Sequence, residues 1–188
     1  MSFFKSRRNS ILFLILIVIL IVPQTRTPIQ VAIHKLKSKI FSASVIDKNE
    51  QERLADYNWK LKDQEGNLYD LKTAEGKVVF INFWATWCPP CIAEMPSLQS
   101  LYNAYDGKME ILFVTNDNEG QISRFIKRKG FDFKVYNPAS DYSHLFEVPS
   151  IPRTFVIDKK GNIVIDESGA IDWFSEDVTN QLDALILE

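Results

Sequence analysis

The two cysteines of this 188-residue chain, Cys88 and Cys91, are separated by two prolines. The apolar run Val78–Trp84 comes before them and predicts a strand that is buried on both faces. The residues Pro89–Tyr105 predict a helix that begins within the motif. Two cysteines three residues apart at a helix start can form a disulfide without distorting the fold, so the pair can exchange electrons with other disulfides.

The position of each cysteine predicts its role. Cys88 falls at the N-cap of the predicted helix, where the helix dipole and unpaired backbone N–H groups stabilise a thiolate, the nucleophile in disulfide exchange. Cys91 lies inside the first turn and suits the resolving role. Because Pro89 and Pro90 have no N–H group, the Cys88 thiolate must depend on later amides such as that of Cys91. With no histidine inside the motif, we predict a weakly stabilised thiolate and therefore a reductant.

Two other uses of the cysteines are weaker. A disulfide that closes a four-residue loop constrains the unfolded chain little, so it is a poor structural staple. A zinc site would need further ligands, and the chain has no third cysteine and only two histidines, His34 and His144. The sequence therefore favours redox chemistry and predicts neither a metal site nor a cofactor.

Charge is divided unevenly along the chain. Residues 1–46 hold seven basic and no acidic residues, whereas residues 47–188 hold 15 basic and 24 acidic residues, which gives +7 and −9. A hydrophobic content of 46% with 12% aromatic residues excludes a disordered chain. The acidic main part argues against nucleic-acid binding, which needs a basic face.

The basic head contains the twelve-residue apolar run Ile11–Val22, inside an uncharged stretch of 17 residues, 9–25. As a helix this stretch is about 26 Å long, the lower limit for a membrane span. We predict an uncleaved signal anchor over residues 1–25, with the remaining domain on the extracytoplasmic side. A cleaved signal is disfavoured because Pro23 follows the run where small residues would be needed. A buried core helix fits poorly because every face is apolar.

Residues 26–56 are predicted to be a membrane-proximal segment and a linker. From Pro28 to Phe41, apolar residues recur at helical spacing, and lysines lie largely off their face. The apolar positions are Ile29, Ala32, Ile33, Leu36 and Ile40. This pattern fits an amphipathic helix on an anionic membrane surface, and it fits equally well a stalk helix packed on the domain. Residues 42–56 are polar and predict a linker.

Residues 57–188 predict one α/β domain with a mixed sheet. Its predicted strands are Tyr57–Lys62, Leu68–Leu71, Val78–Trp84, Met109–Thr115, Lys134–Tyr136, Arg153–Asp158 and Asn162–Asp166. Its predicted helices are Pro89–Tyr105, Glu119–Lys129, Ser140–Phe146 and a last helix capped by Ser175.

The residues around the cysteines resemble the membrane-anchored thioredoxin-like reductases of the TlpA/ResA type. The matching residues are Phe83-Trp84-Ala85-Thr86-Trp87-Cys88-Pro89-Pro90-Cys91 and Glu94-Met95-Pro96. The resemblance implies a thioredoxin fold over residues 55–188, with extra N-terminal strands and the membrane anchor helix. It also implies a cis-proline loop at Ile151-Pro152, for which Pro152 fits better than Pro149. A bound substrate would then contact the backbone of Ile151 and Pro152 and the side chain of Trp87.

One position departs from thioredoxin. Six residues before the first cysteine, thioredoxin has a buried acid, and this chain has Asn82. Glu94, one helical turn after Cys91, is the replacement that could take a proton from the resolving thiol. The alternative is an exposed helix residue without a role.

The sequence therefore predicts a membrane-tethered, extracytoplasmic thiol–disulfide oxidoreductase. Its partners would be disulfide-containing substrate proteins and a membrane electron donor, and resemblance suggests cytochrome c maturation or general disulfide reduction. A thiol peroxidase is disfavoured because Ala85 stands where a Thr or Ser would be needed. A non-catalytic metal chaperone or adaptor is the other alternative, and it fits this cysteine spacing poorly.

Overall fold

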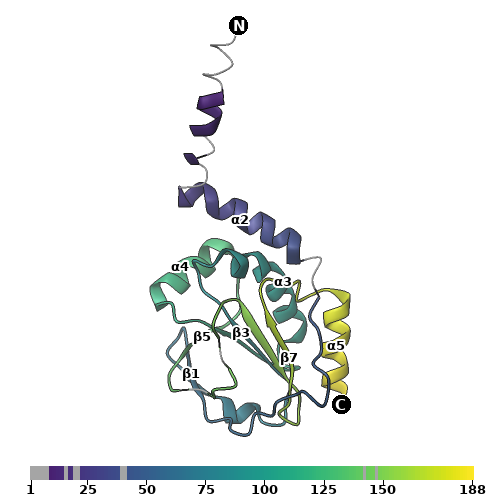
Figure 1. Ribbon diagram of the computed structural model, residues 1–188. Helices are drawn as coiled ribbons and strands as arrows, with labels where there is room; N and C mark the ends of the chain where they lie inside the picture. Colours follow the sequence, from purple (N-terminus) through teal and green to yellow (C-terminus); the bar gives the residue numbers. More distant parts are fainter. Residues whose placement is uncertain (1–8, 15–16, 19–21, 39–41, 142, 147) are drawn as a thin grey trace.

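The computed structural model describes residues 9–14, 17–18, 22–38, 42–141, 143–146 and 148–188 (Figure 1). Its main part is an α/β domain built on one seven-stranded sheet in the order β2-β1-β5-β4-β3-β6-β7. The strands are β1 Lys60–Asp63, β2 Leu68–Asp70, β3 Val79–Phe83, β4 Glu110–Val114, β5 Val135–Pro138, β6 Arg153–Ile157 and β7 Ile163–Ser168. All seven were predicted, with small differences at their ends.

The sheet is mixed, as predicted. β3 pairs in parallel with β4, and β4 pairs in parallel with β5. β6 pairs antiparallel with both β3 and β7, while β1 pairs antiparallel with both β5 and β2. All five residues of β3 are buried, because this strand lies between β4 and β6 and both of its faces are covered.

Three helices cover one face of the sheet. These are α3 Pro89–Tyr105, α4 Glu119–Lys129 and α5 Glu176–Leu187. They contribute Leu98, Phe125 and Leu182 to one core. The opposite face is covered by the short helix η1 Leu71–Ala74 and by irregular chain, which supply a second core. Because side chains alternate along a strand, Phe80 of β3 joins the helix-side core and Ile81 joins the other.

Helix ends follow the sequence closely. α4 begins after Asn118, whose side chain forms a reciprocal capping box with Gln121, and ends at Gly130 in the left-handed conformation. α5 begins after Ser175, as predicted, but the Ser175 side chain makes no capping hydrogen bond. The helix predicted at Ser140–Phe146 is wrong, because the described residues there form turns. A turn in which the Phe146 amide bonds to the Ser143 carbonyl lets Phe146 reach the second core.

The segment predicted as a linker, residues 42–56, lies against the domain. Ala43 and Leu54 are buried. The Ile46 amide donates to the Val164 carbonyl at 2.9 Å, and the Leu54 amide donates to the Gly161 carbonyl at 2.8 Å. The segment therefore packs on the domain although its polar composition predicts a linker, because a few buried apolar residues and these backbone hydrogen bonds hold it there.

Helix α2, Pro23–Ser38, lies against α3 at one end of the domain (Figure 1). The helix was predicted over Pro28–Phe41, and it starts earlier, at Pro23. Residues 39–41 of the predicted helix lie outside the described residues. Residues 9–14 and 17–18 are helical, whereas 1–8, 15–16 and 19–21 of the predicted anchor also lie outside the described residues. Within the part of the chain that is described, no helix is both long and apolar enough to cross a membrane.

The contact between the 42–56 segment and the β6–β7 turn can be tested at Gly161. Gly161 and Gly107 both have positive φ, but a Cβ at Gly161 would lie 3.1 Å from the Tyr57 hydroxyl and 3.2 Å from the Leu54 carbonyl, whereas one at Gly107 meets nothing within 4 Å. Gly107→Ala should cost about 1 kcal/mol of unfolding free energy from backbone strain. Gly161→Ala should cost about 2 kcal/mol more from overpacking. Urea denaturation measures both, and equal losses would contradict the contact.

Candidate active site

Cys88 and Cys91 form a disulfide at the start of α3, with their Cα atoms 5.3 Å apart. Cys88 is the N-cap residue of the helix, as predicted, and Cys91 lies in the first turn. β3 delivers the motif to this position, because the strand ends at Phe83 and the chain turns directly into α3. Both side chains are buried, Cys91 completely and Cys88 to 3% exposure.

One backbone amide faces the Cys88 sulfur. The Cys91 N–H donates to Cys88 Sγ at 3.3 Å. Pro89 and Pro90 occupy the first two helical positions and have no N–H to offer. The amide that the sequence analysis expected to serve a Cys88 thiolate, that of Cys91, therefore points at the same sulfur in the oxidised protein.

A second loop packs against Cys88. The Ile151–Pro152 peptide bond is cis, as the resemblance implied, and Pro149 is not the cis residue. The Ile151 carbonyl oxygen lies 3.7 Å from Cys88 Sγ. A sulfur within a disulfide has no hydrogen to donate, so this is a close contact in the oxidised protein. The backbone before β6 is thereby placed beside the outer cysteine.

Trp87 is 68% exposed next to the disulfide, so the alternative of a core role is wrong. Its indole N–H donates to Asp117 Oδ1 at 3.2 Å, and the Thr86 amide donates to Asp117 Oδ2 at 2.6 Å. The sequence analysis missed Asp117. A signal existed, because Asp117 follows β4, and the carboxyl ends of parallel strands meet at one edge of the sheet.

A hollow of about 290 Å³ lies beside these residues. Its lining includes Trp87, Asp117, Val148 and Ile151. Aromatic and aliphatic side chains therefore surround one acidic group at a site that the cis-proline loop borders. Neither cysteine lines this hollow, but Trp87 and Ile151, which lie beside Cys88, do.

Glu94 lies inside the protein, and the alternative of an exposed helix residue is wrong. Its side chain is 1% exposed. Asn82 Nδ2 donates to Glu94 Oε1 at 2.9 Å, and Trp173 Nε1 donates to Glu94 Oε2 at 3.1 Å. The Ile171 amide donates to Oε2 at 3.4 Å. Burial raises the pKa of Glu94 to about 8, and these hydrogen bonds oppose the rise.

Asn82 joins Glu94 to the cis-proline loop. Asn82 of β3 and Thr154 of β6 are partners in the antiparallel register. Asn82 Nδ2 also donates to Thr154 Oγ1 at 2.8 Å. Asn82 Oδ1, in contrast, is buried and has no hydrogen-bond partner among the described residues. The sequence analysis missed Thr154 and Trp173, which lie 72 and 79 residues away in the chain from their partners Asn82 and Glu94.

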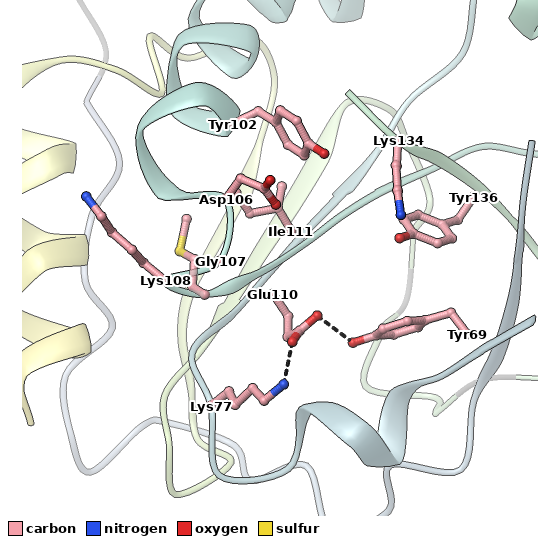
Figure 2. Close-up of a pocket in the computed structure, with 11 residues that line it drawn as sticks. Tyr69, Lys77, Tyr102, Asp106, Gly107, Lys108, Glu110, Ile111, Lys134 and Tyr136 are labelled. Atoms are coloured by element: carbon pink, nitrogen blue, oxygen red, sulfur yellow. Dashed lines mark hydrogen bonds and ion pairs between the residues drawn. The ribbon is translucent and has the colours of Figure 1, made fainter. Parts of the chain in front are cut away.

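A separate cavity of about 380 Å³ lies near the start of β4 (Figure 2). The cysteines follow the other end of the parallel strands, after Phe83 of β3. Some of the charged and hydroxyl groups that line it form an ion pair and a hydrogen bond with one another. Lys77 Nζ lies 2.6 Å from Glu110 Oε1, and the Tyr69 hydroxyl donates to Glu110 Oε2 at 3.0 Å. Its lining includes neither cysteine and none of Trp87, Asp117 and Ile151 beside them, so it is not part of the disulfide site.

The sheet, the cysteine pair at a helix start and the cis-proline loop beside it define a thioredoxin-fold protein with a Cys-X-X-Cys disulfide. The chain belongs to the AhpC/TSA family, whose sequence profile matches residues 55–165, more than half of the chain. It is similar to the thiol-disulfide oxidoreductase ResA of Halalkalibacterium halodurans, with 35% identity over 117 residues, or 61% of this chain. That alignment spans 66% of the relative, just under two thirds of its length.

Two further similarities agree with the resemblance to the TlpA/ResA type. ResA of Geobacillus thermodenitrificans is 34% identical over 128 residues, which are 66% of this chain and 72% of that protein. A solved structure described as thiol:disulfide interchange protein DsbE of Chlorobium tepidum is 25% identical, with a TM-score of 0.58. It covers 77% of this chain and 99% of its own. The predicted thioredoxin fold is thereby confirmed.

The raised pKa of Glu94 makes stability depend on pH. The folded protein keeps a proton on Glu94 up to a pKa of about 8, whereas the unfolded chain releases it near the ordinary value of 4.5. The stabilisation is therefore complete below pH 4.5 and is lost as pH rises to 8. Between these values unfolding free energy should fall by up to about 1.4 kcal/mol per pH unit.

Glu94→Gln should remove this dependence. Urea denaturation of the oxidised protein at several pH values measures it, because disulfide-bonded cysteines do not titrate. The difference between wild type and Glu94→Gln isolates the contribution of Glu94 from that of the other titrating groups. Parallel pH profiles for the two proteins would show that the pKa of Glu94 is not raised.

Proposed function

We propose that this protein is a membrane-tethered, extracytoplasmic thiol–disulfide oxidoreductase that reduces the disulfides of other proteins. The observation that carries the proposal is the arrangement around the cysteines. Cys88 caps α3 beside the Ile151 carbonyl, and Glu94 is buried one turn after Cys91 on the same helix. The relatives named thiol-disulfide oxidoreductase support the class of activity.

The reaction begins in the reduced protein. The Cys88 thiolate attacks one sulfur of a substrate disulfide, and the other substrate sulfur leaves as a thiolate that takes up a proton. The mixed disulfide then joins Cys88 to the substrate. Backbone at Ile151 and the exposed face of Trp87 would hold the substrate chain, since both lie next to Cys88 and line the same hollow.

Resolution of the mixed disulfide requires Cys91 to lose a proton. The ionised fraction of Glu94, about a tenth at pH 7 for a pKa of about 8, takes this proton. The Cys91 thiolate then attacks Cys88, the Cys88–Cys91 disulfide forms, and the second substrate sulfur leaves as a thiolate that takes up a proton from water. Two electrons have then passed from the protein dithiol to the substrate disulfide. A carboxyl with a pKa of about 8 holds such a proton at neutral pH.

Asn82 can serve both forms of Glu94. The amide N–H group suits the carboxylate, whereas a protonated carboxyl needs an acceptor. A half-turn of the amide would present Asn82 Oδ1, the buried oxygen without a partner among the described residues. An ionised acid in this position could not donate to a carboxylate, which gives a physical reason for asparagine where thioredoxin has an acid.

The direction of electron flow follows from the weak support for the Cys88 thiolate. Within the described residues, one amide donates to its sulfur and two prolines follow it. A poorly stabilised thiolate makes the disulfide a weak oxidant, and the dithiol a good reductant. The oxidised protein would be reduced again by a membrane electron donor. Substrates in cytochrome c maturation, or extracytoplasmic disulfides more generally, fit this direction.

Variants of the two cysteines test the proposed activity in an insulin-reduction assay of the full chain in detergent. Cys88→Ser should lose insulin reduction because the attacking sulfur is gone. Cys91→Ser should accumulate mixed disulfides, visible on non-reducing gels, because nothing resolves them. Glu94→Gln should still form the mixed disulfide but resolve it about 100-fold more slowly. Full insulin reduction by Cys88→Ser would rule out the proposal.

The reduction potential tests the direction. We expect a value closer to about −270 mV, typical of disulfide reductants, than to about −120 mV, typical of strong oxidants. Pro90→His should raise the potential by at least about 30 mV, because an imidazolium beside Cys88 stabilises the thiolate. Equilibration with glutathione or dithiothreitol buffers gives both values. A wild-type potential near that of the strong oxidants would refute the reductant assignment.

A further inference from the structure

Helix α2 turns its apolar face away from the domain. Ile29, Ile33 and Leu36 are 47%, 52% and 68% exposed. These positions are separated by four and three residues, so they form one stripe along the helix. A helix on the surface of a globular domain normally buries such a stripe, and here it is left open.

The opposite side of α2 holds the helix on the domain. Val31 and His34 are partly buried, and Ser38 is buried. The Asp172 amide donates to the Ser38 carbonyl at 3.3 Å. Ser38 also lines a hollow together with Ser97 of α3. The side that packs on α3 is therefore the more polar one, and the two sequence alternatives, stalk helix and membrane helix, are not exclusive.

Basic side chains border the open stripe. Arg26, Lys35 and Lys37 are exposed, and none of them takes part in an ion pair within the described residues. The chain has no acidic residue before Asp47, whereas residues 47–188 carry a charge of −9. An apolar stripe with a cationic rim matches the boundary between acyl chains and anionic head groups. The acidic domain is repelled by the same surface.

We propose that α2 is an interfacial helix that docks on an anionic lipid surface through Ile29, Ile33 and Leu36, while its other side holds the domain. The apolar run Ile11–Val22, which the proposed function places in the membrane, ends where α2 begins, so α2 would start at the membrane surface. Because α3 carries Cys88 at its start and lies against α2, this docking sets the orientation of the disulfide site relative to the lipid. The inference rests on the proposed membrane tether but does not require the redox activity.

Tryptophan quenching in lipid nanodiscs tests the docking. The full chain is placed in anionic discs whose lipids carry brominated acyl chains, which quench tryptophans at the acyl boundary. The fluorescence that Leu36→Trp adds over wild type should be about twofold or more lower in the brominated discs than in discs of the same lipids without bromine. Leu68→Trp is the matched control, because Leu68 is an exposed leucine of the domain, at 70%, and its added fluorescence should remain.

The charge and the occupant are tested in the same discs. Replacing Arg26, Lys35 and Lys37 by glutamine in the Leu36→Trp chain should reduce its quenching to the level seen in zwitterionic discs. The Cys88→Ser background should give the same quenching, which separates this result from the redox function. Unquenched Leu36→Trp, quenching that is insensitive to both lipid charge and the three cations, or a dimer that Leu36→Glu dissociates would each overturn the proposal.

Discussion

The structure of the site depends on the burial of one carboxyl group, that of Glu94. Helix α3 carries it inward, and every donor that reaches it comes from elsewhere: Asn82 from β3, and Ile171 and Trp173 from the chain after β7. Burying a carboxyl without partners would cost several kcal/mol. These contacts therefore tie α3, the sheet and the C-terminal segment into one arrangement, and Asn82 extends it to Thr154 beside the cis-proline loop. The same burial gives the group a pKa near that of a proton acceptor working at neutral pH.

The part of the site around Cys88 lies nearer the protein surface than the buried Glu94 does. Cys88 is nearly buried, at 3% exposure, but its neighbours are the exposed Trp87 and the backbone of Ile151. Asp117 accepts hydrogen bonds from the Trp87 indole and the Thr86 amide, so a charged group holds the loop in front of the disulfide. A buried proton site behind the second cysteine and an open docking site before the first suit the two halves of a disulfide exchange.

Much of the fold could be predicted because its signals are local. The apolar run of β3, the proline-started helix α3 and the Gly130 stop of α4 each follow from neighbouring residues. The failures have a different origin. The turn at Ser143–Phe146 replaces a predicted helix because Phe146 is needed in the second core, and residues 42–56 are held by contacts to β7. Neither constraint is visible in the segment itself.

The sequence by itself determined the cysteine pair, its place at a helix start, and the lack of backbone donors at the two prolines, because all three depend on adjacent residues. Only the tertiary structure decided that Thr154 and Trp173 belong to the site, since they lie 72 and 79 residues from their partners and no periodic pattern links them. The same holds for α2. Helical spacing showed which residues share a face, but packing against α3 decided that the apolar face points outward.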